Sequence, residues 1–116
     1  MPHVLLVEDE PYVGELYQMG LVAAGHDTEL VRSQDEALQR LDTLRYDVVI
    51  TDWRLAHGGD GLAVAQRAAH FGMKTIVVSA YLFQMKDADR RHEYVMKPIR
   101  PTELTDVVKR VLAPPR

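Results

Sequence analysis

Five short apolar segments, separated by stretches with helical character, restrict the fold of this chain more than any other feature. The most apolar of them is DVVIT at residues 47–51. Segments of this length and composition are typical of strands that are buried on both faces of a parallel sheet. Because strands that alternate with helices form βαβ units, the sequence predicts an α/β fold with a doubly wound, five-stranded parallel sheet. The predicted strands are residues 3–7, 28–32, 47–51, 75–79 and 93–96.

The segments between the strands carry signals for helix ends. Pro11 suits the first turn of a helix that Gly25 would end. Ser33 and Glu36 have the spacing of a capping box and predict the start of the next helix. Residues 102–112 repeat apolar side chains at helical spacing, which predicts a last helix packed on the sheet. The first helix is predicted to bury Val13, Leu16, Tyr17 and Leu21.

Length, charge and hydropathy exclude several classes of function. The 116 residues are enough for one domain, which we expect to occupy residues 1–116. A net charge of −3 with scattered arginines argues against a nucleic-acid-binding surface. The apolar run Val4–Val7 is too short for a signal peptide or a membrane span, and the chain has no cysteine. These features predict a cytoplasmic domain that binds neither nucleic acid nor membrane.

Polar side chains follow four of the predicted strands. Glu8 and Asp9 follow the first, Asp52 the third, Ser79 ends the fourth, and Lys97 follows the fifth. The carboxyl ends of the strands in a doubly wound sheet lie along one edge, so we expect these side chains to meet. Carboxylates about 4 Å apart repel by roughly 4 kcal/mol at an effective dielectric of 20, so such a cluster requires a cation. Oxygen ligands favour Mg²⁺ in that role.

This set of groups suits the transfer of a phosphoryl group to a carboxylate. Asp52 is the best candidate nucleophile, because it follows the most apolar strand and a carboxylate can attack phosphorus. Mg²⁺ and Lys97 would neutralise charge on the phosphoryl oxygens, and Ser79 would donate a hydrogen bond. The alternatives are that Asp52 caps a turn, that Ser79 caps a helix, and that Lys97 is a solvated surface lysine.

Four motifs occur in an order that resembles the receiver domains of two-component response regulators. They are LLVEDEP (5–11), VVITDWRL (48–55), IVVSAY (76–81) and YVMKPIRP (94–101), and the resemblance covers essentially the whole chain. The resemblance implies a flavodoxin-like strand order of 2-1-3-4-5. It also implies that the domain is a phosphoacceptor that assists its own phosphorylation and dephosphorylation, rather than an enzyme.

The resemblance assigns roles to individual residues. Glu8, Asp9, Asp52 and the backbone carbonyl of Arg54 would hold Mg²⁺. Asp52 would accept phosphate from a histidine kinase or a histidine phosphotransfer protein, and Lys97 would then pair with that phosphate. The downstream protein partner stays unidentified.

Further positions around the phosphate follow from the same resemblance. Ser79 and Tyr94 would form the switch that responds to phosphorylation, and the Lys97–Pro98 bond would be cis. Tyr94 as an ordinary half-buried strand aromatic is the alternative. Arg54 and Tyr81 would flank the phosphoryl group, and we hypothesise that these bulky side chains restrict the attacking water.

The chain departs from the family pattern in two places. Ala56 stands where the family usually has proline, and Asp60-Gly61 arrives one residue late, after Gly58-Gly59. We therefore expect a longer and more mobile loop here. Ser79 and Lys97 are 18 positions apart, fewer than is common, and residues 82–92 are polar and weakly periodic. The fourth helix is expected to be short or partly unwound.

Three other functions are alternatives for this chain. A receiver-fold binding module that is never phosphorylated is the main alternative, although all the pocket residues are retained. A phosphatase with an aspartate nucleophile would need a second aspartate where Arg54 stands. A flavin-binding protein would need a phosphate-binding loop where Glu8, Asp9 and Glu10 would repel a phosphate. Trp53, the only tryptophan, is predicted to pack in the core beside Asp52.

Overall fold

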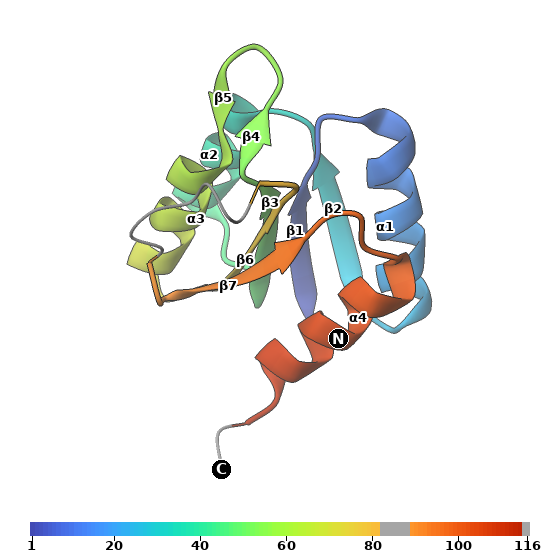
Figure 1. Cartoon of the computed structure of the whole chain (residues 1–116). Helices are drawn as coiled ribbons and strands as arrows, with labels where there is room; N and C mark the ends of the chain where they lie inside the picture. The colour runs from blue at the N-terminus through green and yellow to red at the C-terminus, as the bar shows by residue number, and fades with distance from the viewer. Residues whose placement is uncertain (82–88, 115–116) are drawn as a thin grey trace.

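A five-stranded parallel sheet forms the centre of the molecule (Figure 1). The structure is a computed structural model that describes residues 1–81 and 89–114. The strand order is β2-β1-β3-β6-β7. Because β4 and β5 are a separate short hairpin, this order is the predicted 2-1-3-4-5. Each predicted strand lies within one residue of the observed one. The strands are β1 (His3–Val7), β2 (Asp27–Val31), β3 (Val48–Asp52), β6 (Lys74–Ser79) and β7 (His92–Met96).

Four described helices cover the two faces of the sheet, so the doubly wound architecture is confirmed (Figure 1). The helices α1 (Pro11–Ala23) and α4 (Pro101–Leu112) lie on one face, and α2 (Gln34–Thr43) and α3 (Gly61–His70) lie on the other. The short fourth helix expected within residues 82–92 falls mainly on residues 82–88, which lie outside the described residues. Among the described residues, no helix is both long enough and apolar enough to cross a membrane.

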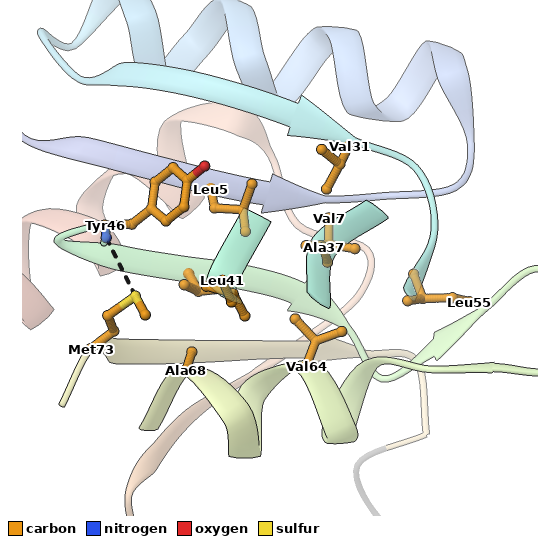
Figure 2. Packing of buried hydrophobic residues seen from close by; sticks show 11 residues of the cluster. Leu5, Val7, Val31, Ala37, Leu41, Tyr46, Leu55, Val64, Ala68 and Met73 are labelled. Carbon is orange, nitrogen blue, oxygen red and sulfur yellow. Dashed lines mark hydrogen bonds between the residues drawn. The ribbon is translucent and has the colours of Figure 1, made fainter. Parts of the chain in front are cut away.

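The alternation of side chains along the strands divides the core into two clusters. In β1, Leu5 and Val7 point toward α2 and α3, whereas Val4 and Leu6 point toward α1 and α4. Figure 2 shows the first cluster, in which the Tyr46 backbone N–H contacts the Met73 sulfur at 3.3 Å. Burial of each large apolar side chain contributes about 1.5–3 kcal/mol, so both faces of the sheet stabilise the fold.

The inner face of α1 differs in one position from the sequence prediction. Tyr17 and Leu21 are buried as predicted, and Val13 is partly buried against the same cluster. Leu16, however, is 39% exposed, and Gly14 is buried in its place. The buried face of α1 is centred on Gly14, Tyr17 and Leu21, and Leu16, about 100° from Tyr17 around the helix, lies at the edge of that face.

A two-stranded hairpin follows β3, where a mobile loop was expected. The strands β4 (Arg54–Leu55) and β5 (Gly59–Asp60) pair in antiparallel fashion and project beyond the end of β3 (Figure 1). His57 and Gly58 have φ values of 58° and 74°, and the Gly59 N–H bonds to the Ala56 carbonyl. Two consecutive residues with positive φ are the signature of a type I′ turn, whose twist matches that of paired strands. The paired residues therefore replace much of the expected loop.

Candidate functional site

The carboxyl ends of the central strands bring the predicted polar residues to one edge of the sheet. Asp52 is the last residue of β3 and Ser79 is the last of β6. Glu8 and Asp9 follow β1, and Lys97 follows β7. Parallel pairing in register holds these ends level with one another. The structure thus brings these five side chains, from distant parts of the chain, to one edge of the sheet.

Lys97 bridges two buried carboxylates. Its ammonium nitrogen lies 2.9 Å from Glu8 Oε1 and 3.0 Å from Asp52 Oδ1. Glu8 is only 1% exposed and Asp52 only 7%. Buried charges are stable only when they are paired and hydrogen-bonded, so the Lys97 ammonium stabilises the Glu8 and Asp52 carboxylates in their buried positions. The alternative of a solvated surface lysine is wrong.

The three carboxylates also form a candidate cation site. Glu8, Asp9 and Asp52 each offer one oxygen, and these oxygens lie within 4.8 Å of one another. Three carboxylate oxygens, one of them from the partly exposed Asp9, match the preference of Mg²⁺ for carboxylates and retained waters. The donor set therefore fits Mg²⁺.

The carboxylates shift one another's proton affinity. Burial, and then the hydrogen bond and charge of Glu8, raise the pKa of Asp52 to about 9. Burial alone would raise the pKa of Glu8 as well, but hydrogen bonds with Asp52 and Lys97 and the Lys97 charge lower it. Burial and the neighbouring Glu8 raise the pKa of Asp9. These directions favour the protonated form of Asp52, so binding of a divalent ion here would be coupled to release of a proton.

Ser79 shapes the other side of the site. Its hydroxyl oxygen accepts the Tyr81 N–H at 2.9 Å, and its carbonyl accepts the Lys97 N–H at 3.0 Å. The first bond closes a local turn, and among the described residues the hydroxyl hydrogen stays free to donate. The alternative that Ser79 caps a helix concerns residues 82–88, which lie outside the described residues. A cleft of about 140 Å³ opens beside it. It is lined by Asp52, Arg54, Val78, Ser79, Ala80, Tyr81 and Lys97.

Arg54 lies at the mouth of this cleft between two aromatic rings. Its guanidinium carbon is 4.6 Å from the Trp53 ring centroid and 5.8 Å from that of Tyr81. Such cation–π contacts hold an arginine in place without a carboxylate partner. Trp53 is half-buried, so the prediction that it packs in the core is wrong. It follows the last residue of β3 and therefore lies at the edge of the sheet rather than between its faces.

Tyr94 lies apart from the residues that line the cleft. It is half-buried on β7, and its hydroxyl donates to the Asp89 carbonyl at 2.9 Å. Its ring meets the His92 ring edge-on, with 6.1 Å between the centroids. Close by on the chain, the Lys97–Pro98 peptide bond is cis, as the resemblance implied.

Gly61 contributes to the site in a way that the sequence prediction missed. A Cβ at this position would lie 1.4 Å from the carbonyl oxygen of Asp52. The Gly61 N–H donates to the Trp53 carbonyl at 2.8 Å, so α3 begins directly against the backbone of Asp52. The Asp60-Gly61 pair was visible in the sequence, but its contact with Asp52 depends on the path of the β4–β5 hairpin. Only glycine allows so close an approach.

A family model, the response regulator receiver domain, matches residues 4–109. This chain belongs to that family. Receiver domains are the phosphoacceptor domains of two-component signalling, and the geometry described above agrees with that membership.

Curated relatives of this receiver domain include a transcriptional regulatory protein and a DNA-binding response regulator. The transcriptional regulatory protein BaeR of Escherichia coli is 29% identical over 96% of this chain and 48% of its own length. The DNA-binding response regulator MtrA of Mycolicibacterium smegmatis is 32% identical over 91% of this chain and 48% of its own length. The receiver domain thus spans about half the length of the curated relatives it matches.

Solved structures of response regulators share the fold of this receiver domain. The response regulator TrrA of Thermotoga maritima, in complex with Mg²⁺ and BeF, is 33% identical with a TM-score of 0.83. That similarity covers 97% of this receiver domain and 100% of TrrA. CheY4 of Vibrio cholerae, at 21% identity, matches in fold with a TM-score of 0.84 over 97% of this chain and 99% of its own.

Proposed function

We propose that Mg²⁺-dependent phosphorylation of Asp52 switches the protein–protein contacts of this receiver domain. The observation that carries the proposal is the Lys97 ammonium, 2.9 Å from Glu8 and 3.0 Å from Asp52 at the carboxyl edge of the sheet. A buried nucleophile beside a cation and an acidic pair is suited to accept a phosphoryl group.

The residues that would hold Mg²⁺ are Glu8, Asp9, Asp52 and the backbone carbonyl of Arg54. The first three are supported by their mutual distances within 4.8 Å and by their oxygen chemistry. The complex of TrrA with Mg²⁺ and BeF supports the same ion in a relative. When bound, Mg²⁺ would neutralise charge on the phosphoryl group and on the carboxylates.

Phosphoryl transfer uses the side chains around the cleft. A carboxylate oxygen of Asp52 attacks the phosphorus of a phosphohistidine, the new O–P bond forms, and the P–N bond to the histidine breaks. The leaving imidazole takes its proton from water. Lys97 exchanges its contact with Asp52 for one with a phosphoryl oxygen, and the Ser79 hydroxyl donates to another.

The signalling role follows from the added charge. A phosphoryl group brings about −1.5 to −2 charge units, which would draw Ser79 toward it and favour a new position of Tyr94. We propose a histidine kinase or a histidine phosphotransfer protein as the donor, and a cytoplasmic setting. We also propose that residues 1–116 form one domain, that it contacts neither DNA nor membrane, and that it assists its own phosphorylation and dephosphorylation without acting on other substrates.

The experiment is phosphorylation by a small donor followed by mass spectrometry of the intact protein and its peptides. With Mg²⁺ and acetyl phosphate, we expect one phosphoryl group on Asp52, and none in Asp52→Asn. Omitting Mg²⁺ should abolish the mass gain. Asp47→Asn provides a matched control, because Asp47 is an exposed carboxylate just before β3 that bonds only the His3 N–H among the described residues. No mass gain in the wild type would favour a binding module that is never phosphorylated.

A further inference from the structure

The inner face of α1 contacts Glu8 and the segment after Lys97. A Cβ on Gly14 would lie 3.1 Å from Leu30 Cδ1 and 3.4 Å from Glu8 Cγ, and one on Gly20 would lie 3.0 Å from Pro101 Cβ. Glycine inside a helix is destabilising relative to alanine, so two of them on one face need a structural reason. Here the reason is close approach, because the α1 backbone packs against Leu30 and Glu8 at one end and against Pro101 at the other.

Tyr17 lies between these two glycines on the same face of α1. Its side chain is 7% exposed and belongs to the core cluster that includes Leu21 and Leu104. Its hydroxyl donates to the Ile99 carbonyl at 3.0 Å, across 82 positions of sequence. Within residues 1–81 and 89–114, this is the one hydrogen bond that joins α1 to residues 97–101. Tyr17 therefore ties a helix of the core to the segment that carries Lys97.

The segment from Lys97 to Pro101 makes few other main-chain hydrogen bonds. The Arg100 N–H donates to Glu103 of α4 at 3.1 Å, and the Ile99 side chain packs against the core. Pro98 and Pro101 have no backbone N–H, so two of its five residues cannot donate a main-chain hydrogen bond. The Lys97 N–H is used by the Ser79 carbonyl at 3.0 Å. The lysine backbone is thus held at its start by β6 and, two residues later, by the Tyr17 hydroxyl.

We propose that Tyr17 is a positioning residue for Lys97, acting through its hydrogen bond to the Ile99 carbonyl. The proposal rests on the proposed function, in which Lys97 moves from Asp52 to a phosphoryl oxygen. The reach of the ammonium is set by where its backbone lies. A group that stabilises a transition state loses much of its effect when it is misplaced by about 1 Å. Tyr17 thus contributes to phosphoryl transfer without touching the phosphoryl group.

The test compares Tyr17→Phe with Tyr46→Phe. Tyr46 is the matched control, because it is 8% exposed and its hydroxyl donates to Glu29 at 2.7 Å, but it packs under the opposite face of the sheet. Each variant loses one hydroxyl and keeps its ring. Mg²⁺ affinity is measured by Trp53 fluorescence, and the initial rate of Asp52 phosphorylation is measured with phosphoramidate at saturating Mg²⁺.

We expect Tyr17→Phe to keep its Mg²⁺ affinity and to be phosphorylated roughly fivefold more slowly, the rate change equivalent to one ordinary hydrogen bond. Tyr46→Phe should match the wild type in both. The ¹⁵N signal of the Lys97 ammonium should shift or broaden only in Tyr17→Phe. A Tyr17→Phe protein with the wild-type rate and ammonium signal would overturn the proposal and leave the proposed function intact. A wild type that is not phosphorylated would overturn the proposed function, and the ammonium signal alone would then decide whether Tyr17 positions Lys97.

Discussion

Replacing Gly61 by alanine should damage both the fold and the phosphoacceptor, because the new methyl group would occupy the space of the Asp52 carbonyl. The Cβ would lie 1.4 Å from that oxygen and 2.9 Å from Thr51 Oγ1, whereas an ordinary contact is at least 3.4 Å. Flexible side chains cannot relieve this overlap, so the backbone of β3 or of α3 must move. Overpacking of this kind costs about 1–3 kcal/mol, and loss of the hydrogen bond from Gly61 to Trp53 adds ~1 kcal/mol.

Urea unfolding measures the loss of folding stability in Gly61→Ala. A loss of about 3 kcal/mol corresponds to a midpoint lower by roughly 1.5 M, for a slope near 2 kcal/mol per molar. Gly58→Ala is the control: its Cβ meets open space, so only its φ of 74° is unfavourable. That strain costs about 1–2 kcal/mol, so the urea midpoint of Gly58→Ala should fall by less than that of Gly61→Ala. In the folded fraction, phosphorylation of the Gly61→Ala protein should slow by more than about tenfold, because the nucleophile is displaced. A variant with the wild-type midpoint and the wild-type rate would refute the reasoning.

Two other predictions concern the mouth of the cleft and a buried histidine. In the doubly substituted protein Arg54→Ala/Tyr81→Ala, removal of the side chains that flank the cleft should speed loss of phosphate by at least about fivefold. The rate is measured as loss of ³²P label from the phosphorylated protein. The control is Arg45→Ala, which removes an arginine stacked 4.1 Å from the Phe71 ring centroid, outside the site, and should leave the rate of phosphate loss unchanged. Equal rates in the wild type, the control and the double variant would contradict the hypothesis that Arg54 and Tyr81 restrict the attacking water. Burial lowers the pKa of His92 below its usual 6.5, so below pH 6.5 the unfolded chain binds more protons there than the folded one. The stabilising contribution is present above pH 6.5 and is lost as the pH falls through the folded pKa, by at most about 1.4 kcal/mol per pH unit. Urea midpoints between pH 7 and pH 5 should therefore fall more steeply for the wild type than for His92→Asn, and parallel curves would contradict the assignment.

Much of the site could be predicted because its residues follow strands. Asp52 ends an apolar run, and Glu8, Ser79 and Lys97 stand at the ends of three others. In a parallel sheet, the carboxyl ends of all the strands lie at the same edge, so position along the chain translates into position in space. The strand bounds were predicted to within one residue because the apolar runs mark them directly. The buried face of α1 was misjudged at Leu16, because burial at the edge of a helix face depends on the elements packed against it.

The fold class, the strand ends and the polar groups at the carboxyl edge follow from the order of residues alone, since they depend on local periodicity and on order along the chain. Packing in three dimensions was needed to show that Gly61 abuts the Asp52 carbonyl, that the Trp53 ring contacts the Arg54 guanidinium, and that Tyr17 bonds the segment after Lys97. Each of those contacts joins segments whose separation depends on helix packing and hairpin geometry. Such distances result from the whole packed chain, and no local pattern of residues encodes them.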